Sequence, residues 1–352
     1  MKIGIFDPYL DTLGGGEKYV LDIASCLSQN HSVFLFWDDP AILKKAKERF
    51  NINLSNVSTT QNIFSSGNSF IRKVKKTKEY DVIFYVSDGS IPTLFSKRNI
   101  LIFQFPTLWV NGKSLTTKLK LKKIDAVICY SYFVKSFLDK LLGVESIVIP
   151  PAVETVLKPF KKENIILTVG RFTKGKNEKK QEILIDAFKK MCDRGLSEWK
   201  FVVVGAVLPA DEKFVQDLKS RVKGYPIEVS ENVSFEKLMI YYGKAKIYWH
   251  GAGFGEDLAK HPEYAEHFGI STVEAMGAGA VPVVINAGGQ KEIVEEGLSG
   301  FLWDTIQELQ NKTMKLAQDK NLWEKMSSAA QKRAEFFAGD RFCREINKLI
   351  NS

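Results

Sequence analysis

The sequence has few cysteines and no long hydrophobic segment. Its 352 residues include four cysteines, and none of them has the spacing of a metal site or a redox pair. We therefore expect Cys26, Cys129, Cys192 and Cys343 to be reduced thiols in the core of a cytoplasmic protein. No apolar run reaches the roughly 18 residues that cross a bilayer, and the first residues lack the layout of a secretion signal. These absences predict a soluble globular protein.

Two common nucleotide-binding signatures are also absent. No segment matches a P-loop, and the glycines at residues 14–16 do not form a Gly-x-Gly-x-x-Gly fingerprint. The chain has no internal repeat and no low-complexity linker. Any nucleotide site therefore has to be built in another way.

Positive charge is concentrated in the first half of the chain. Residues 1–150 carry 20 lysines and arginines against 13 acids, a net charge of +7, while the remainder carries 30 against 28. The excess lies in two runs, at residues 72–78 and 113–123. Such runs form either a solvated helix face or a basic surface for anionic lipid or a polyanionic acceptor. Neither run has interleaved aromatic residues, which argues against nucleic acid as a partner.

Short β-branched or aromatic runs alternate with helical patterns, which predicts an α/β fold with parallel, doubly wound sheets. Pro150-Pro151 and the polar stretch 158–164 interrupt the alternation, and this predicts a domain boundary at residues 155–156. Strands are expected at residues 2–6, 32–37, 81–86, 99–103, 126–130, 146–149, 165–169, 200–204, 226–229, 246–249 and 281–285. Helices are expected at residues 17–29, 41–50, 68–79, 115–124, 132–142, 179–193, 211–222, 234–243, 271–278, 305–318, 320–337 and 339–350.

Residues 266–284 contain two acids near the start of a short helix, which is predicted at residues 271–278. Glu266 precedes a Phe-Gly turn, Glu274 stands in the first predicted helical turn, and a buried strand follows. Ser271 and Glu274 have the spacing of a capping box, which predicts Ser271 as the N-cap. Both acids then lie near a positive helix end that also holds anions. Taken alone, the pattern is equally that of a helix cap beside a solvated loop acid.

Two further segments place N–H groups or cations after predicted strands. The glycines at residues 14–16 let the backbone approach an anion closely. Arg171 follows the strand at 165–169 and Lys179 stands at the start of the next predicted helix, so that two cations can hold a diphosphate from two sides. A plain strand-to-helix turn and a basic surface loop are the alternatives.

These motifs together resemble the signatures of retaining, nucleotide-sugar-dependent glycosyltransferases of family 4. Glu266 to Glu274 resembles their Glu-x7-Glu signature, residues 14–17 resemble their Gly-Gly-x-Glu loop, and Arg171 with Lys179 resembles their Gly-Arg…Lys pair.

Other segments extend the resemblance to both halves of the chain. Residues 287–293 resemble the Gly-Gly-x-x-Glu-Ile stretch behind the donor sugar, and residues 150–153 resemble the Pro-Pro-x-Val hinge. The long loop from His250 to Glu266 is similar to that of mannosyltransferase-like members.

The resemblance implies a GT-B fold, in which two Rossmann-like domains face each other across a cleft. Residues 1–155 would be the acceptor-binding domain, residues 156–335 would bind the nucleotide sugar, and the helix at 336–352 would pack back on the N-terminal domain. The implied reaction moves a hexose to a hydroxyl group of a glycan or lipid-linked acceptor, with GDP-mannose as the leading donor. The protein would be cytoplasmic or peripheral on the inner face of a membrane, and would use no metal and no cofactor.

The resemblance also implies roles for individual residues. Glu266, Arg171 and Lys179 would be catalytic, and Gln104 would lie on the acceptor side. The donor would be held by Gly15, Gly16, Arg171, Lys179, His250, Phe268, Gly269, Ile270 and Glu274.

The sequence departs from the family pattern at two places and leaves two rival functions. Gln104 stands in the region where many relatives have a histidine, and glutamine cannot titrate. The loop before Lys179 is longer than usual, so Lys176 or Lys180 is an alternative phosphate ligand. A NAD-dependent dehydrogenase or epimerase, with Asp38 on the ribose, is one rival. A non-catalytic nucleotide-sugar-binding relative is the other.

Overall fold

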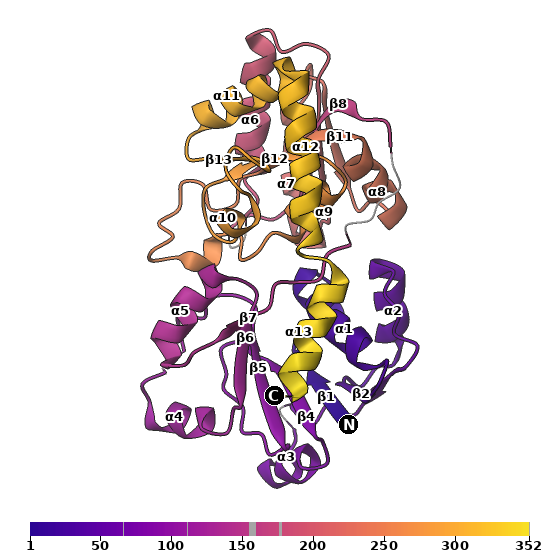
Figure 1. The fold of residues 1–352 in the computed structure, drawn as a ribbon, viewed down its shortest axis with the longest axis vertical. Coiled ribbons are helices and arrows are strands. Elements are labelled where there is room, and N and C mark those ends of the chain that lie inside the picture. Colours follow the sequence, from indigo (N-terminus) through magenta and orange to yellow (C-terminus); the bar gives the residue numbers. More distant parts are fainter. Residues whose placement is uncertain (66, 111, 155–159, 176–177, 352) are drawn as a thin grey trace. The chain divides into compact units, whose positions relative to one another are not determined.

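The computed structural model describes residues 1–65, 67–110, 112–154, 160–175 and 178–351. The chain forms two compact units, which we call the first unit (Met1–Ala152 with Gly339–Ser352) and the second unit (Val153–Ala338). Figure 1 shows their elements. The expected boundary at 155–156 lies outside the described residues.

The first unit contains a parallel sheet with the strand order β3-β2-β1-β4-β5-β6-β7. Parallel strands are covered by helices on both faces and read as continuous apolar runs, and all five residues of β4 are buried. The strands are β1 (Lys2–Phe6), β2 (Ser32–Phe36), β3 (Val57–Thr60), β4 (Val82–Val86), β5 (Arg98–Phe103), β6 (Ala126–Cys129) and β7 (Ile147–Val148).

The α-helices of the first unit follow or flank these strands. Three of them begin at a serine whose hydroxyl accepts a hydrogen bond from a backbone N–H in the first turn, at Ser69, Ser114 and Ser131. The helices are α1 (Gly15–Leu27), α2 (Ala41–Phe50), α3 (Phe70–Thr77), α4 (Leu115–Leu121), α5 (Tyr132–Leu142) and α13 (Gly339–Asn351).

A disulfide joins α1 to α13 within the first unit. It links Cys26 to Cys343, and beside it the rings of Tyr19 and Phe342 pack at 5.2 Å between centroids. The expectation of four reduced thiols is therefore wrong for this pair, while Cys129 and Cys192 are free. The two bonded cysteines are 317 residues apart in sequence, so their spacing carried no signal. Only the packing of α13 on α1 brings them together.

The second unit contains a parallel sheet with the order β10-β9-β8-β11-β12-β13, and its core includes the fully buried Trp249 and Trp303. The strands are β8 (Glu163–Val169), β9 (Lys200–Gly205), β10 (Ile227–Glu231), β11 (Ala245–His250), β12 (Val281–Ile285) and β13 (Phe301–Trp303). The helices are α6 (Gln181–Asp193), α7 (Glu212–Arg221), α8 (Phe235–Lys244), α9 (Ile270–Gly277), α10 (Gln290–Ile293), α11 (Ile306–Gln318) and α12 (Lys320–Glu335).

The predicted class, α/β with two doubly wound parallel sheets, is confirmed. The sequence analysis missed short elements, among them β3, β13 and α10. Strand β3 is an edge strand of sequence VSTT, and the other two elements have only three and four residues. None of them is long enough to establish a period in the sequence.

Each sheet has one place where the chain reverses the direction in which it adds strands. In the first unit this switch lies between the neighbouring strands β1 and β4, and in the second unit it lies between β8 and β11. Loops leave the carboxyl ends of two such strands in opposite directions, and the crevice between them is where open α/β sheets bind ligands.

Candidate functional site

The switch point of the second unit brings Arg171, Lys179 and His250 to one edge of the sheet. Strand β8 ends two residues before Arg171, and its neighbour β11 ends at His250. Gly170 permits the close approach of the following loop, since a Cβ placed there would lie 2.7 Å from Cγ of Lys179.

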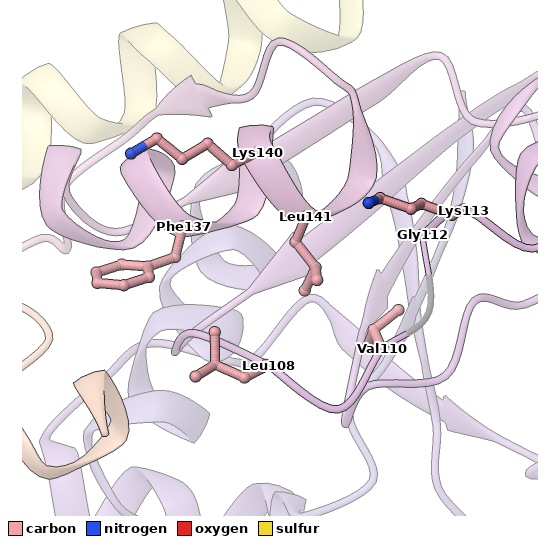
Figure 2. Close-up of a pocket in the computed structure, with 7 residues that line it drawn as sticks. All are labelled: Leu108, Val110, Gly112, Lys113, Phe137, Lys140 and Leu141. Atoms are coloured by element: carbon pink, nitrogen blue, oxygen red, sulfur yellow. The ribbon is translucent and has the colours of Figure 1, made fainter. Parts of the chain in front are cut away.

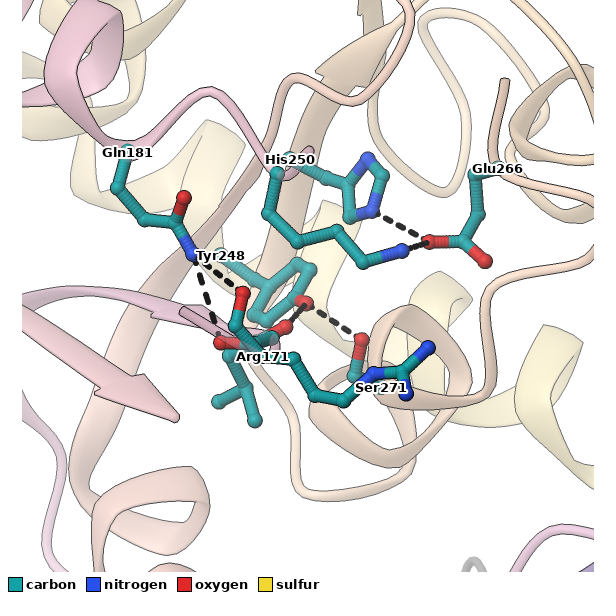
Figure 3. A network of polar contacts seen from close by, with 9 residues as sticks. Arg171, Gln181, Tyr248, His250, Glu266 and Ser271 are labelled. Carbon is teal, nitrogen blue, oxygen red and sulfur yellow. Dashed lines mark hydrogen bonds and ion pairs between the residues drawn. The ribbon is translucent and has the colours of Figure 1, made fainter. Parts of the chain in front are cut away.

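Glu266 is the centre of a small charged network in this crevice. Its Oε2 accepts a hydrogen bond from Nζ of Lys179 and lies 2.8 Å from that atom, and it lies at the same distance from Nε2 of His250 (Figure 3). His250 is almost completely buried, whereas the side chains of Lys179 and Glu266 are 17 % and 18 % exposed. Part of the lysine and of the carboxylate is therefore open to a ligand, whereas the histidine is not.

The charge state of this network follows from its contacts. Burial alone raises the pKa of Glu266, but Lys179 and His250 outweigh burial and hold that pKa well below its ordinary value. Glu266 is thus a carboxylate at neutral pH, and a carboxylate only accepts hydrogen bonds. The hydrogen in the contact with His250 is therefore on Nε2 of the imidazole.

Contacts of the main chain hold Arg171 in position. Nε2 of the buried Gln181, the first residue of α6, donates to the carbonyl oxygen of Arg171 at 3.0 Å. The neighbouring Phe172 is buried and forms a bridge to Val207. The Arg171 side chain is exposed and forms no ion pair within the described part of the chain. Its guanidinium group is therefore available to an anion.

The predicted capping box at the start of α9 is wrong. The helix begins at Ile270 with Gly269 as its N-cap, so Ser271 lies inside the first turn. The hydroxyl of Ser271 instead accepts a hydrogen bond at 2.7 Å from Tyr248 on β11. Gly269 has a φ of 121°, which favours glycine and moves the helix start ahead of the serine.

Glu274 also has a partner that the sequence did not reveal. The hydroxyl of the fully buried Tyr242 donates to Oε2 of Glu274 at 2.7 Å. Burial and the nearby carboxylate raise the pKa of Tyr242 well above its ordinary value, so the phenol keeps its proton. Glu274 is therefore held from α8.

Backbone contacts fix the segment between the two acids. The N–H of Gly289 donates to the carbonyl oxygen of Glu266 at 2.8 Å, and a Cβ on Gly288 would lie 2.3 Å from that same oxygen. The side chain of Phe268 is buried against Phe337, with ring centroids 5.3 Å apart. A contact between Phe268 and a ligand would therefore come from its main chain, as is also expected at Gly269.

The two adjacent lysines before α6 have different partners. Lys180 pairs with Glu256 at 2.6 Å, whereas Lys179 pairs with Glu266. Lys176, the other alternative, lies outside the described residues. The structure thus brings Lys179 together with His250 and Glu266 and holds Lys180 on the long loop that precedes Glu266.

The glycine loop of the first unit contacts the predicted acceptor-side residue. Nε2 of Gln104 donates to the carbonyl oxygen of Gly16 at 3.1 Å, and a Cβ on Gly16 would lie 2.3 Å from Oε1 of Gln104. Helix α1 begins at Gly15, and Glu17 accepts from the N–H of Gly14 at 2.6 Å.

Open, doubly wound α/β sheets bind ligands, nucleotides among them, at such switch points. The family model for glycosyl transferases group 1 matches residues 153–333, which are 181 of the 352 residues. The chain therefore belongs to this family, as the motifs had indicated. Membership favours a transferase over a dehydrogenase or epimerase.

Solved structures of similar proteins confirm the GT-B fold. The Anabaena protein HepE in complex with UDP and glucose has a TM-score of 0.72 at 21% identity, over 100% of this chain and 99% of that chain. Sucrose-phosphate synthase from Thermosynechococcus elongatus has a TM-score of 0.74 at 17% identity, over 99% and 98% of the two chains.

A curated relative is similar over part of its length. The Xenopus laevis protein named GDP-Man:Man(3)GlcNAc(2)-PP-Dol alpha-1,2-mannosyltransferase is 32% identical over 179 residues, which are 46% of this chain. The match spans only 34% of that relative.

Sequence reasoning missed the side chains that position the predicted ones. These are the buried polar residues Tyr242, Tyr248 and Gln181. They donate hydrogen bonds to Glu274, to Ser271 and to the main chain of Arg171, respectively. A tyrosine in a β-strand or helix gives the same sequence signal whether it packs in the core or bonds to a functional carboxylate. Only the spatial neighbours distinguish the two cases.

Proposed function

We propose that this chain is a retaining glycosyltransferase that moves mannose from GDP-mannose to a hydroxyl group of a glycan or lipid-linked acceptor, without a metal ion. Family membership and the name of the Xenopus laevis relative support the reaction class and the donor. The network of Lys179, Glu266 and His250 at the second switch point is the observation that carries the proposal.

In this proposal Arg171 and Lys179 neutralise the diphosphate of the donor. A leaving nucleotide diphosphate gains negative charge in the transition state, and fixed cations stabilise that charge. The guanidinium of Arg171 is exposed and suits two phosphate oxygens, while Lys179 supplies a point charge from the other side. With these two cations the site needs no metal ion for the same purpose.

Glu266 holds the sugar and balances the positive charge that develops at its anomeric carbon. Its lowered pKa and its two hydrogen-bond donors make it a poor proton acceptor. The departing phosphate oxygen is then the base that takes the acceptor proton. Attack and departure on the same face of the sugar give retention of configuration.

The remaining predicted residues act on the nucleotide and on the phosphates. Glu274, fixed by Tyr242, accepts hydrogen bonds from the ribose hydroxyls. The backbone N–H groups of Gly15 and Gly16 lie at the start of α1, and a helix start is a favourable place for an anion such as a phosphate.

A thermal-shift experiment with nucleotides in EDTA tests the donor site. GDP at 100 times its dissociation constant should add about 2.7 kcal/mol to stability, or roughly 5–10 °C in a unit of this size. UDP and TDP test the choice of base. Lys179→Ala should reduce the shift, while Lys180→Ala is the matched control. If no nucleotide changes the melting temperature, the donor-site assignment is wrong.

We also propose that the first unit docks on anionic membrane, from which it would take a lipid-linked acceptor. Leu115 and Leu119 on α4 are 73% and 54% exposed, and Phe70 and Ile71 on α3 are 61% and 79% exposed. Phe70 of α3 and Lys123, which follows α4, both pack on the ring of Phe95.

Basic residues are neighbours of these apolar residues in the sequence, as in helices that lie at a membrane interface. They are Arg72, Lys73, Lys75, Lys76, Lys118, Lys120, Lys122 and Lys123. Among the described residues, no helix is long and apolar enough to cross a membrane. Vesicle co-sedimentation tests the docking. Binding should require anionic lipid and weaken with salt, and equal binding to neutral and anionic vesicles would contradict the proposal.

A further inference from the structure

The first unit has its own switch-point crevice, and exposed aromatic residues border it. Tyr9 follows the carboxyl end of β1, and Asp88-Gly89 follows the carboxyl end of the neighbouring strand β4. Strand β5 lies next to β4 and leads into the loop that carries Trp109. Three adjacent strands therefore deliver these residues to one edge, where such sheets bind ligands.

Trp109 is exposed but held in place. Its side chain lies on the backbone of Gly89, where a Cβ would be only 2.1 Å from the indole Nε1. Gly89 also has a φ of 108°, so both its conformation and its contact require glycine. The residue is 59% exposed, while the other tryptophans of the chain are buried or half-buried. A large, rigid aromatic surface thus faces solvent.

The loop around Trp109 is anchored on its other side to α5. Val110 is buried, and a Cβ on Gly112 would lie 2.0 Å from the carbonyl oxygen of Leu141. Figure 2 shows Leu108 and Val110 lining a pocket of about 340 Å³ against α5. Because the loop is fixed on both sides, the indole loses little conformational entropy when a ligand covers it.

Polar acceptors surround the indole at this edge. Tyr9 is 42% exposed, and its pKa is raised first by burial and then by the nearby carboxylate of Asp88. Asp88 is exposed and forms no ion pair among the described residues. Beneath them, Asp7 is 2% exposed, and its Oδ2 has no hydrogen-bond partner in the described structure. The edge therefore offers aromatic faces and the exposed carboxylate of Asp88.

We infer that this crevice binds a neutral saccharide, the sugar of the acceptor that receives the transferred hexose. The apolar face of a pyranose ring stacks on the indole of Trp109, and its hydroxyl groups bond to Asp88 and Tyr9. Carboxylates repel phosphate, so the phosphate of a lipid does not belong here. The inference rests on the proposed function, because it names the acceptor's chemistry for that reaction.

Intrinsic fluorescence tests the stacking directly, because Trp109 is the exposed tryptophan of the chain. The probes are four trisaccharides, namely maltotriose, cellotriose, chitotriose and an α-linked mannotriose. We expect at least one of them to shift the emission to the blue in a saturable way. Calorimetry with the same sugar should then show about a tenfold loss of affinity in Trp109→Ala, a smaller loss in Trp109→Phe and a loss in Asp88→Asn.

Leu108→Ala is the matched control, because Leu108 is an exposed apolar residue of the same loop that lines the pocket. It should keep the affinity for the sugar. The inference is overturned if none of the four sugars binds, or if Leu108→Ala loses as much affinity as Trp109→Ala. It is also overturned if a short-chain anionic phospholipid, and no sugar, shifts the emission.

A nucleotide thermal shift on the same variants separates this inference from the proposed function. If GDP or UDP stabilises every variant but the sugars do not bind, only the saccharide site is refuted. If the sugars bind but no nucleotide does, the saccharide site stands as a binding site and the transferase proposal fails.

Discussion

The buried acid Asp7 makes a sharp prediction about the pH dependence of stability. Burial raises the pKa of Asp7 to about 7 from the ordinary 3.8, and the charge of Glu17 adds to this rise. Its Oδ1 accepts a hydrogen bond from the N–H of Tyr9 at 2.9 Å, while Oδ2 has no partner among the described residues. Asp7→Asn keeps the first contact and removes the ionisation.

The direction in which stability changes with pH follows from proton binding. Between pH 3.8 and about 7 the folded state holds a proton on Asp7 that the unfolded chain has released. Stability therefore falls as the pH rises through this window and then stays low. At about 1.36 kcal/mol per pKa unit, the total loss is about 4 kcal/mol. Asp7→Asn should recover this loss at pH 8 and change little at pH 4.

Scanning calorimetry at pH 4, 6 and 8 measures the effect. In a unit of this size the recovery corresponds to roughly 10 °C in the melting temperature of the first unit at pH 8. Asp11→Asn, at an exposed position of the same loop, controls for the loss of one negative charge. A stabilisation by Asp7→Asn that is equal at pH 4 and pH 8 would refute the reasoning, because it would not depend on ionisation.

Three other predictions concern the donor site, the disulfide and the glycine loop. Glu274→Ala should weaken nucleotide binding about tenfold in calorimetry, whereas Glu266→Ala should leave that affinity nearly intact and lower turnover; equal losses of affinity would contradict this division. Cys26→Ser should cost the first unit about 2–4 kcal/mol without reductant and nothing in its presence, and the untreated wild-type protein should be lighter than the reduced one by two hydrogens. Gly16→Ala should destabilise the first unit, because its methyl group would meet Gln104 at 2.3 Å. Adding Gln104→Ala should restore the melting temperature, and no restoration would locate the strain elsewhere.

The sequence predicted the sheets because buried parallel strands are locally apolar. Runs such as Val82–Val86 and Val281–Ile285 need no spatial information to be recognised. The prediction that Ser271 is the N-cap was wrong, because a positive-φ glycine and a tyrosine from strand β11 override the local capping pattern. The expectation of reduced thiols at Cys26 and Cys343 was wrong because the disulfide also depends on a contact between segments that are distant in sequence.

The candidate site shows a similar division. Motif resemblance selected Glu266 and Lys179, and the structure places them in direct contact. The roles assigned to them remain predictions. The sequence alone does not distinguish Lys179 from Lys180, and in the fold the two adjacent lysines differ in the carboxylate that each one meets.

The two switch points have the same backbone topology and opposite chemistry, which argues for a division of labour between them. Fold alone does not determine function, and the side chains at each crevice decide what it binds. The second crevice offers Arg171 and Lys179, which suit a diphosphate. The first offers Trp109, Tyr9 and Asp88, which suit uncharged hydroxyl groups. The net positive charge of the first half of the chain therefore does not describe its ligand edge, and the lysines that produce it are available for a different surface.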